Sequence, residues 1–313
     1  MTAPSAIVGD PSIHKAFLDS HVPFLREFSE LQKLANRVWV TALQRYNQPL
    51  ETEPQEEEVA KLSGLRLAQI IVFYLARASF DGLYDVFILV GNGRGFAAKM
   101  MLRVMYEHLV TASFIAANPE EAKRFDNHAS IEKWKLWTRT LKVLPQVEDT
   151  VPAEEIAKLD QLQQQARTQL KSEICNKCGQ PKTQAAWTRV AVDTMAEQVD
   201  TATGSSLANL YAPCYLMPTA LMHPTPFGLE SRLESTETDV IYKELPEHEG
   251  HDALLRGHGI ALRLLKLINC YFGLGFDTEL DARWEAFPKI WGGALVDPPP
   301  VPEQEPQKDG SES

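Results

Sequence analysis

The sequence lacks several features that define common classes of protein. Its longest strongly apolar, charge-free run spans residues 70–76, far short of the roughly 20 residues that cross a bilayer. Its four cysteines are too few and too scattered for a disulfide framework. The first eleven residues contain neither the basic nor the apolar region of a signal peptide. We therefore expect a cytoplasmic protein that does not contact a membrane.

Positive charge is also scarce. The chain has 31 Lys and Arg against 42 Asp and Glu, for a formal net charge of -11 at pH 7. Such an acidic surface repels phosphate backbones, which argues against generic DNA binding. Hydrophobic residues make up 44% of the 313 residues and charged residues 23%. This balance leaves enough apolar side chain for a large core and excludes a wholly disordered chain.

The spacing of apolar residues predicts an all-α fold, a multi-helix bundle without significant sheet. Residues 13–46 repeat apolar side chains at helical steps, and residues 65–80 are apolar nearly all round, as a central helix would be. Residues 96–117 form the next long helix, and Asn118 is a suitable N-cap for a helix over 118–144. Further helices are expected at 152–170, 184–199, 207–223 and 253–272, the third of these interrupted by Pro213 and Pro218.

Composition divides the chain into three parts. Residues 1–11 are expected to be an N-terminal arm, and residues 12–292 a helical domain with an excursion at about 150–182 that holds a polar helix and a Cys-x-x-Cys segment. Residues 293–313 are acidic and rich in proline. They bury too little apolar surface to offset the entropy of ordering, so they are expected to be a disordered tail.

The sharpest polar feature is the segment RVMYEH, which lies within the most apolar of the predicted helices. Arg103 and Glu107 are four residues apart and share a helical face, and His108 follows directly. Charged groups among apolar residues are costly unless they are paired. One interpretation is a structural ion pair that fixes the register of the helix. The other is a ligand site, in which Arg103 holds an anion and Glu107 or His108 moves a proton.

Two residues of a later segment are candidates for the same site. His223 stands at a predicted helix end, where a histidine commonly bonds a backbone carbonyl. Alternatively, His223 folds back onto the face that carries Arg103, Glu107 and His108. Tyr211 would then supply a hydroxyl nearby. The ligand-binding set predicted from sequence is therefore Arg103, Glu107, Tyr211 and His223.

Three blocks of the sequence carry a resemblance to a known family. The first covers residues 80–128 and contains Arg103, Glu107, Glu120, Glu121, Arg124 and Phe125. The second is AAWTRVAVDTMAEQV, and the third is YAPCYLMPTALMHPTP, which contains Tyr211, His223 and Pro224. Together they resemble the uncharacterised bacterial helical proteins called the domain of unknown function 5677 family. Thr219 stands where that family usually has Ser. The resemblance implies a helical fold and no established reaction.

A more distant similarity is to the HEPN ribonuclease superfamily, whose hallmark is an Arg, four to six residues, and a His. Arg103 and His108 match that spacing, although Val104 stands where a polar residue is common. The resemblance implies that Arg103 would hold the scissile phosphate and that His108 would assist metal-free attack by the ribose 2′-OH. It also implies RNA as substrate and a site shared between two subunits.

Cys175 and Cys178 have the spacing of a zinc knuckle, with Gly179 suited to close the turn. A closed zinc site needs four ligands, and the remaining cysteines are isolated in the sequence. The two thiols are therefore either free on a loop or part of a zinc site that a second subunit completes. Residues 247–252 hold two histidines among acids, which favours a solvated loop over a metal site.

The leading expectation is thus a cytosolic helical protein whose Arg/Glu/His site binds an anionic ligand or a protein partner without turnover. One alternative is a HEPN-like metal-independent ribonuclease of the toxin or antiviral type, acting through Arg103 and His108. Another is a zinc-supported oligomerisation module built on Cys175 and Cys178. The partners expected are an anionic small molecule, RNA or a second copy in a homodimer. No cofactor is expected apart from zinc at the two cysteines.

Overall fold

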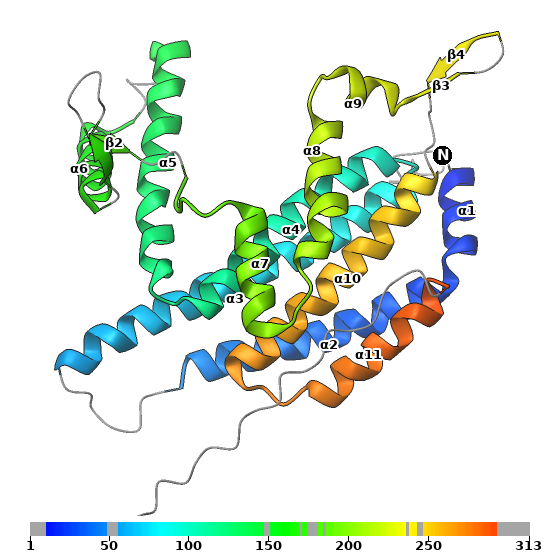
Figure 1. The fold of residues 1–313 in the computed structure, drawn as a ribbon, viewed down its shortest axis with the longest axis horizontal. Coiled ribbons are helices and arrows are strands. Elements are labelled where there is room, and N and C mark those ends of the chain that lie inside the picture. The colour runs from blue at the N-terminus through cyan, green and yellow to red at the C-terminus, as the bar shows by residue number, and fades with distance from the viewer. Residues whose placement is uncertain are drawn as a thin grey trace, which may run out of the picture. The chain divides into compact units, whose positions relative to one another are not determined.

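The computed structural model describes residues 11–48, 56–146, 151–169, 171–174, 181–183, 186–235, 238–242 and 247–292. Within these residues the all-α prediction is confirmed, because eleven α-helices make up most of the structure and the only strands form two short hairpins (Figure 1). The predicted tail at 293–313, the N-terminal arm before Pro11 and the two cysteines at 175 and 178 lie outside the described residues.

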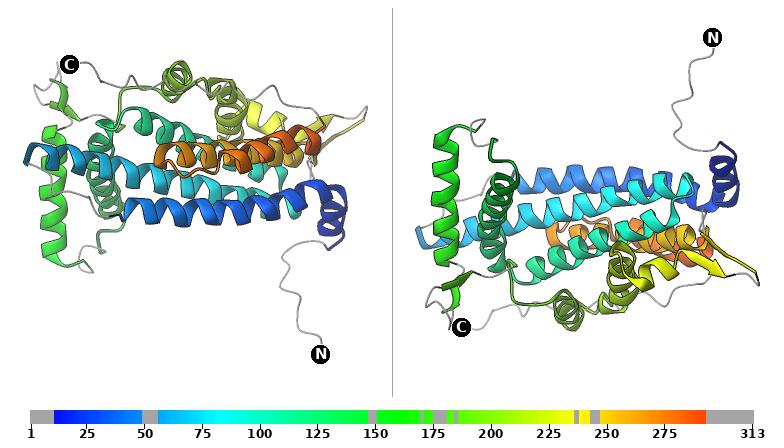
Figure 2. Two further views of the ribbon diagram at one scale, coloured as in Figure 1. Left: turned by 90° about the horizontal axis from the view of Figure 1, so that it is seen from below. Right: turned by 90° about the horizontal axis from the view of Figure 1, so that it is seen from above.

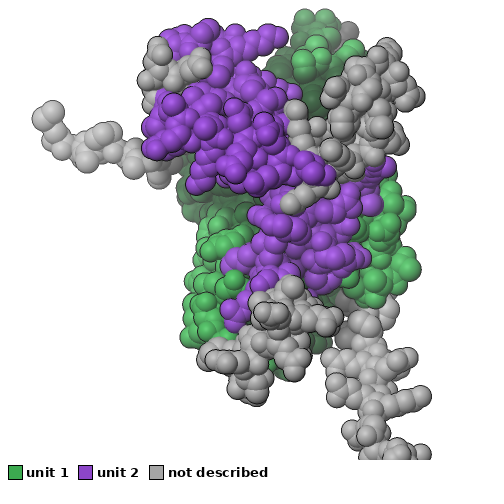
Figure 3. Space-filling model, turned by 90° about the vertical axis from the view of Figure 1, so that its left-hand side faces the viewer, with its two compact units in different colours: residues 1–50, 72–117, 192–313 green, residues 51–71, 118–191 purple. Residues whose placement is uncertain are grey.

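The chain forms two compact units. Unit 1 comprises residues 1–50, 72–117 and 192–313, and unit 2 comprises residues 51–71 and 118–191 (Figure 3, green and purple). The boundary falls within α3 (Glu56–Gly91), between residues 71 and 72. The excursion predicted at about 150–182 belongs to unit 2.

Unit 1 is built on long helices with shorter elements after them. In chain order these are α1 (Pro11–Ser20), α2 (Val22–Tyr46), the second part of α3, α4 (Gly95–Ala117), α7 (Val192–Thr203), the 3-10 turn η2 (Ala208–Leu210), the π-helix η3 (Ala212–Leu216), α8 (Met217–Met222), α9 (Pro226–Glu230), β3 (Leu233–Ser235), β4 (Val240–Tyr242), α10 (Glu247–Phe272) and α11 (Asp277–Ile290). Figure 2 shows α2, α4, α10 and the unit 1 part of α3 running side by side.

The core of unit 1 centres on α4. Leu102, Met105 and Leu109 are fully buried, and most other residues of α4 from Leu102 to Ile115 are also buried. A helix without a broad polar face belongs in the middle of a bundle, as its composition predicts. The helix packs against α7, α8, η3 and, most extensively, α10. The polar residues of α4 are therefore placed close to side chains from distant parts of the sequence.

Small residues let these helices approach closely. A Cβ added at Gly82 in α3 would lie 2.7 Å from Cγ of Met105 in α4. A Cβ added at Gly250 in α10 would lie 3.0 Å from Cγ1 of Val90 in α3. Because carbon atoms in van der Waals contact lie about 3.5–4.0 Å apart, neither position has room for a side chain. The two glycines thus allow α3 to pack closely against α4 and against α10.

Unit 2 contains α5 (Glu121–Val143), α6 (Ala153–Gln169) and the hairpin of β1 (Lys171–Ile174) and β2 (Pro181–Thr183). The two helices pack against each other, and Nε1 of Trp134 donates a 2.9 Å hydrogen bond to Oδ1 of Asp160. Phe125 packs edge-on against Trp187, with ring centroids 5.3 Å apart. The hairpin pairs Lys171 with Thr183 and Ile174 with Pro181.

Several predicted boundaries were wrong. The helix expected at 13–46 is broken at His21 into α1 and α2. The helix after Ala117 begins at Glu121 with Glu120 as its N-cap, so Asn118 does not cap it. The helix expected at 184–199 begins at Val192.

Tertiary contacts explain the larger errors. Residues 247–252, expected to be a solvated loop, instead form the first turn and a half of α10, where Glu249 and Asp252 pair with Lys99 of α4. The β3–β4 hairpin, which precedes α10 in the sequence and pairs Leu233 with Tyr242, was not predicted. The helix α11 was not predicted from the sequence, and it contains Pro288 near its C-terminal end.

The structure also bears on membrane insertion. Among the described residues, no helix combines the length and the apolar character that a bilayer crossing requires.

Candidate functional site

Arg103 and Glu107 lie one turn apart on α4 and form the ion pair that their spacing predicts. Nε of Arg103 donates a 3.2 Å hydrogen bond to Oε1 of Glu107. The two side chains are 25% and 35% exposed, so the pair lies at the edge of the core and still meets solvent. Within the described residues, Nη1 and Nη2 of Arg103 have no hydrogen-bond partner. Four of the five N–H donors of the guanidinium therefore have no partner among the described residues.

The ring of Tyr215 lies against one face of the Arg103 guanidinium. Cζ of Arg103 lies 4.9 Å from the centroid of the Tyr215 ring, within the range of a cation–π contact. Tyr215 lies in the π-helix η3, which contacts α4 and includes Pro213. The hydroxyl of Thr219 donates a 2.5 Å hydrogen bond to the carbonyl of Tyr215. The hydroxyl that the family resemblance placed at this position thus anchors the widened turn.

Tyr211 joins the same arrangement through Tyr215. The two rings are stacked, with centroids 5.1 Å apart and planes inclined by 16°. Burial raises the pKa of Tyr211, and the nearby carboxylate of Asp193 raises it further. Tyr211 therefore keeps its proton at neutral pH and can donate a hydrogen bond. Of the predicted ligand-binding residues, Arg103, Glu107 and Tyr211 thus belong to one arrangement, which we call the Arg103–Tyr215 site.

Tyr106, which is buried, and Asp200, which is partly buried, support the elements of this site. The Tyr106 ring lies 6.4 Å from both Tyr211 and Tyr215, and its hydroxyl donates a 3.1 Å hydrogen bond to the carbonyl of Leu207. The carboxylate of Asp200 accepts hydrogen bonds from the backbone N–H groups of Leu207 and Ala208, at 2.6 and 2.8 Å. These hydrogen bonds hold the backbone at Leu207 and Ala208, which precede η3 in the chain.

His108 lies on a different face of α4 from Arg103. Five positions along an α-helix correspond to a rotation of about 140°, so the two side chains diverge. Burial lowers the pKa of His108, against a smaller effect of Glu107 that raises it. Nδ1 of His108 is buried and has no hydrogen-bond partner among the described residues. The histidine is therefore neutral at pH 7, with one ring nitrogen unsatisfied.

His223 lies at the C-terminal end of α8, and its side chain is exposed. Its backbone is extended there, and its carbonyl accepts a 2.8 Å hydrogen bond from the N–H of Thr225. Within the described residues, no hydrogen bond or ion pair connects His223 to Arg103, Glu107 or His108. Of the predicted ligand-binding residues, His223 is thus the one that makes no hydrogen bond, ion pair or ring contact with the Arg103–Tyr215 site in the described part of the chain.

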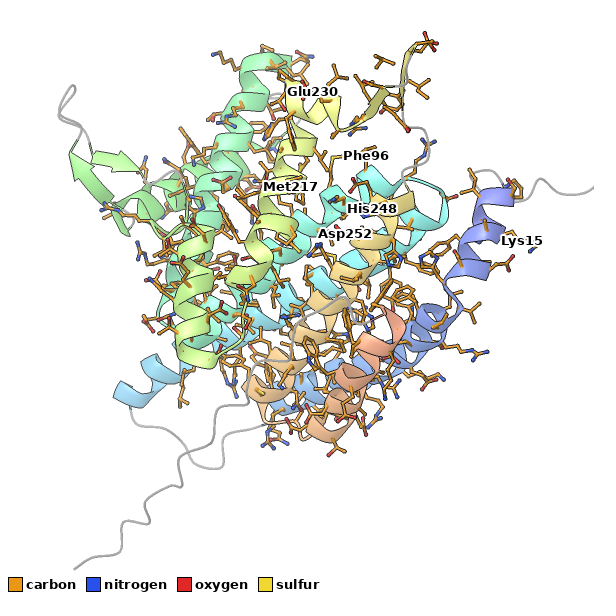
Figure 4. All side chains as sticks on the ribbon, turned by 45° about the vertical axis from the view of Figure 1, so that its right-hand side comes forward. Lys15, Phe96, Met217, Glu230, His248 and Asp252 are labelled. Atoms are coloured by element: carbon orange, nitrogen blue, oxygen red, sulfur yellow. The ribbon has the colours of Figure 1, made fainter. Side chains whose placement is uncertain are left out.

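A second set of charges on α4 was not found from the sequence. Lys99, one turn before Arg103, forms ion pairs with Glu249 and with Asp252, the latter at 3.5 Å. Asp252 in turn accepts a 2.7 Å hydrogen bond from Nε of Arg256. Figure 4 shows Asp252 on α10, one turn beyond His248. The only local signal is the spacing of four residues between Asp252 and Arg256, because the pairing with Lys99 spans some 150 residues.

Two features limit the chemistry available around the site. The thiol of Cys214 is buried, and this burial raises its pKa to about 12, so it is not a thiolate nucleophile at neutral pH. Within the described residues, no group of three or more His, Cys, Asp or Glu side chains is arranged to hold a metal ion. The cysteines proposed to bind zinc lie outside these residues, between β1 and β2.

Glu120, Glu121, Arg124 and Phe125, which also carry the family resemblance, lie in unit 2. Arg124 forms an ion pair with Glu121 at 2.9 Å, and Phe125 packs against Trp187. The predicted Arg-Phe pair thus serves contacts within unit 2. The resemblance therefore rests on residues of both units.

Comparison with known proteins adds one finding. Residues 69–241 match the model of a family of unknown function, DUF5677. No curated protein and no solved structure gave a match. The matched segment contains Arg103, Glu107, Tyr211 and Tyr215 and covers more than half of the chain. The protein therefore belongs to the DUF5677 family.

Proposed function

We propose that the protein binds the anionic group of a small ligand, a carboxylate or a phosphate, at the Arg103–Tyr215 site without chemical turnover. The observation that carries this proposal is the state of the Arg103 guanidinium. Its Nε is bonded to Glu107 and its face lies over Tyr215, while Nη1 and Nη2 have no partner among the described residues. A planar guanidinium fixed in this way presents two parallel donors that match a carboxylate or phosphate.

The surroundings favour a ligand of modest affinity. The ring of Tyr211 stacks on that of Tyr215, and its hydroxyl keeps its proton and can donate a hydrogen bond. The carboxylate of Glu107 opposes a second negative charge at Arg103. Replacing that carboxylate by a neutral amide should therefore strengthen anion binding.

The test uses inorganic phosphate and acetate as probes, titrated into the full-length protein by calorimetry. Arg103→Gln should weaken binding about tenfold or more, since a hydrogen bond to a charged group contributes roughly 1.5–3 kcal/mol. Arg77→Gln is the matched control, because Arg77 is also paired with a carboxylate four residues on, Asp81, and also lies over an aromatic ring, that of Trp39. The control should bind as the wild type does.

Two outcomes would contradict the proposal. One is equal binding by wild type and Arg103→Gln, which would make Arg103–Glu107 a structural ion pair only. The other is unchanged or weaker binding by Glu107→Gln. Circular dichroism of each variant checks that the helices remain folded.

A ribonuclease of the HEPN type is the second candidate, and one observation favours it. His108 is neutral and has a buried, unbonded Nδ1, as a proton acceptor would require. The separation of Arg103 and His108 around α4 opposes their joint action within one chain. Purified protein would be incubated with total RNA beside Arg103→Ala and His108→Ala. Cleavage that both substitutions abolish would establish the nuclease, and intact RNA in the wild type would exclude it under these conditions.

A further inference from the structure

Exposed apolar side chains gather at one corner of unit 1, over α8, α9 and the β3–β4 hairpin. Six of them fall within residues 222–242, namely Met222, Phe227, Leu229, Val240, Ile241 and Tyr242. We call these six residues the corner surface. The elements that carry them are connected, because α9 contacts both α8 and β3. Contiguous exposed apolar patches on a folded protein commonly mark interaction sites.

The fold turns these residues outward by a specific contact. Gly228, in the middle of α9, is buried against the end of α8, and a Cβ there would lie 2.8 Å from the carbonyl oxygens of Ala220 and His223. The flanking residues Phe227 and Leu229 are left 48% and 56% exposed. The N–H of Gly228 also donates to the hydroxyl of Thr225, which caps the helix. The orientation of Phe227 and Leu229 is therefore fixed rather than incidental.

The hairpin adds an uncovered apolar strand. Leu233 pairs with Tyr242 and Ser235 with Val240, so the hairpin has two strands of three residues each. Successive residues of a strand face opposite sides, yet Val240, Ile241 and Tyr242 are all exposed. Both sides of β4 are thus open to solvent within the described part of the chain. An isolated two-stranded hairpin is marginally stable in water, and a partner packed on it would stabilise it.

Charge around the corner surface selects the kind of partner. The exposed charged side chains within the described part of 222–242 are the carboxylates of Glu230, Glu234 and Asp239. Figure 4 places Glu230 on α9. The basic residue of this segment, Arg232, lies over the ring of Phe96 at 5.0 Å and donates a 3.0 Å hydrogen bond to the hydroxyl of Tyr242. The apolar residues are therefore bordered by negative charge.

We propose that the corner surface docks an amphipathic helix of another protein, with an apolar face bordered by Lys or Arg. The apolar face would cover Phe227, Leu229 and β4, while the basic residues would face the three carboxylates. A second copy of the chain would bring its own carboxylates against them, which electrostatics disfavours. An anionic membrane surface is disfavoured for the same reason. Docking of an amphipathic helix on an apolar surface is a common mode of peptide recognition.

The test uses a synthetic peptide of Leu and Lys at helical spacing, labelled with a fluorophore and titrated with the full-length protein. A peptide with Glu in place of every Lys is the control for charge. The double variant Phe227→Ser, Leu229→Ser should bind the Lys peptide about tenfold or more weakly, as expected for central apolar contacts. Ile88→Ser removes an equally exposed apolar side chain elsewhere in unit 1 and should leave binding unchanged.

Three outcomes would overturn the proposal. The first is equal binding of the Lys peptide by the double variant and by wild type, and the second is equal binding of the Glu peptide. The third is sedimentation of the wild type as a dimer that Leu229→Ser converts to a monomer, which would assign the surface to a second copy. If circular dichroism shows that the double variant is unfolded, Ile241→Ser on the hairpin replaces it. Arg103→Gln should not change peptide binding, so this test is independent of the proposed anion site.

Discussion

Nε1 of Trp291 donates a 3.1 Å hydrogen bond to Nδ1 of His258, and both side chains are buried. His258 lies in the middle of α10, and Trp291 directly follows α11. The imidazole is surrounded by the rings of Phe24, Phe287 and Trp291, at centroid distances of 5.7, 4.8 and 6.3 Å. Burial lowers the pKa of His258 to about 3. A neutral histidine thus accepts the bond that ties the end of α11 to α10.

The first prediction concerns pH. Because the folded-state pKa of His258 lies below the value of 6.5 for an unfolded chain, the unfolded state takes up a proton between about pH 6.5 and 3 and the folded state does not. As the pH falls through that range, this histidine alone should lower the free energy of unfolding by about 1.4 kcal/mol for each pH unit. His258→Gln keeps an acceptor for Trp291 and should reduce the slope by that amount in denaturant titrations. An unchanged slope would show that His258 titrates normally in the fold.

The second prediction concerns helix spacing. Gly82→Ala places a Cβ 2.7 Å from Cγ of Met105, so we expect it to lower the free energy of unfolding by about 1–3 kcal/mol despite the better helix propensity of alanine. Gly64→Ala is the control on the same helix, because nothing lies within 4 Å of its added Cβ. It should stabilise by up to about 1 kcal/mol. Thermal unfolding of the two variants should therefore shift in opposite directions.

The third prediction concerns the support beneath the Arg103–Tyr215 site. Tyr106→Phe removes the hydrogen bond to the carbonyl of Leu207 and leaves that carbonyl without this donor in a buried place. We expect a loss of about 1–2 kcal/mol in the free energy of unfolding by urea. Tyr74→Phe should have almost no effect, because Tyr74 is exposed. Equal stability of the two variants would mean that the Tyr106 hydroxyl contributes nothing.

The fourth prediction concerns the turn before η3. Asp200→Ala removes the acceptor of two backbone N–H groups, those of Leu207 and Ala208, and should destabilise the fold by about 1–3 kcal/mol. Asp19→Ala removes a carboxylate that pairs with Lys15 on the surface and should change stability by less than about 0.5 kcal/mol. If the turn positions Tyr215, the Asp200 variant should also weaken phosphate binding. Phosphate binding as strong as that of the wild type would show that the turn does not position Tyr215.

Much of the helical architecture follows from local sequence. The apolar character of α4 predicts its central position, and the spacing of Arg103 and Glu107 predicts their ion pair, because both depend on residues within one or two turns. The start of α10 could not be predicted in this way. Its acidic first turns resemble a solvated loop until Lys99, far away in the sequence, supplies the opposite charge.

The site was predictable only in part for the same reason. Tyr211 could be singled out by its segment, but Tyr215 could not, because its ring meets Arg103 through the packing of η3 on α4. Pro213 and Pro218 indicate an interruption without indicating its form. His223 was grouped with Arg103 on the hypothesis that it folds back onto the face of Arg103 and Glu107, whereas the structure ends α8 at His223 in an extended conformation with an exposed side chain.

The π-helix at 212–216 has a consequence for chain length. A π-turn accommodates one residue more than an α-turn does. Deleting a single residue there would restore the ordinary α-turn and change the separation of Tyr211 and Tyr215 from four positions to three. The stacking of Tyr211 on Tyr215 would then be lost, and with it the contact between the Tyr215 ring and the Arg103 guanidinium, even though no residue of the site had been replaced. Homologues that are one residue shorter at this point are thus expected to have a different surface above Arg103, whatever their identity elsewhere.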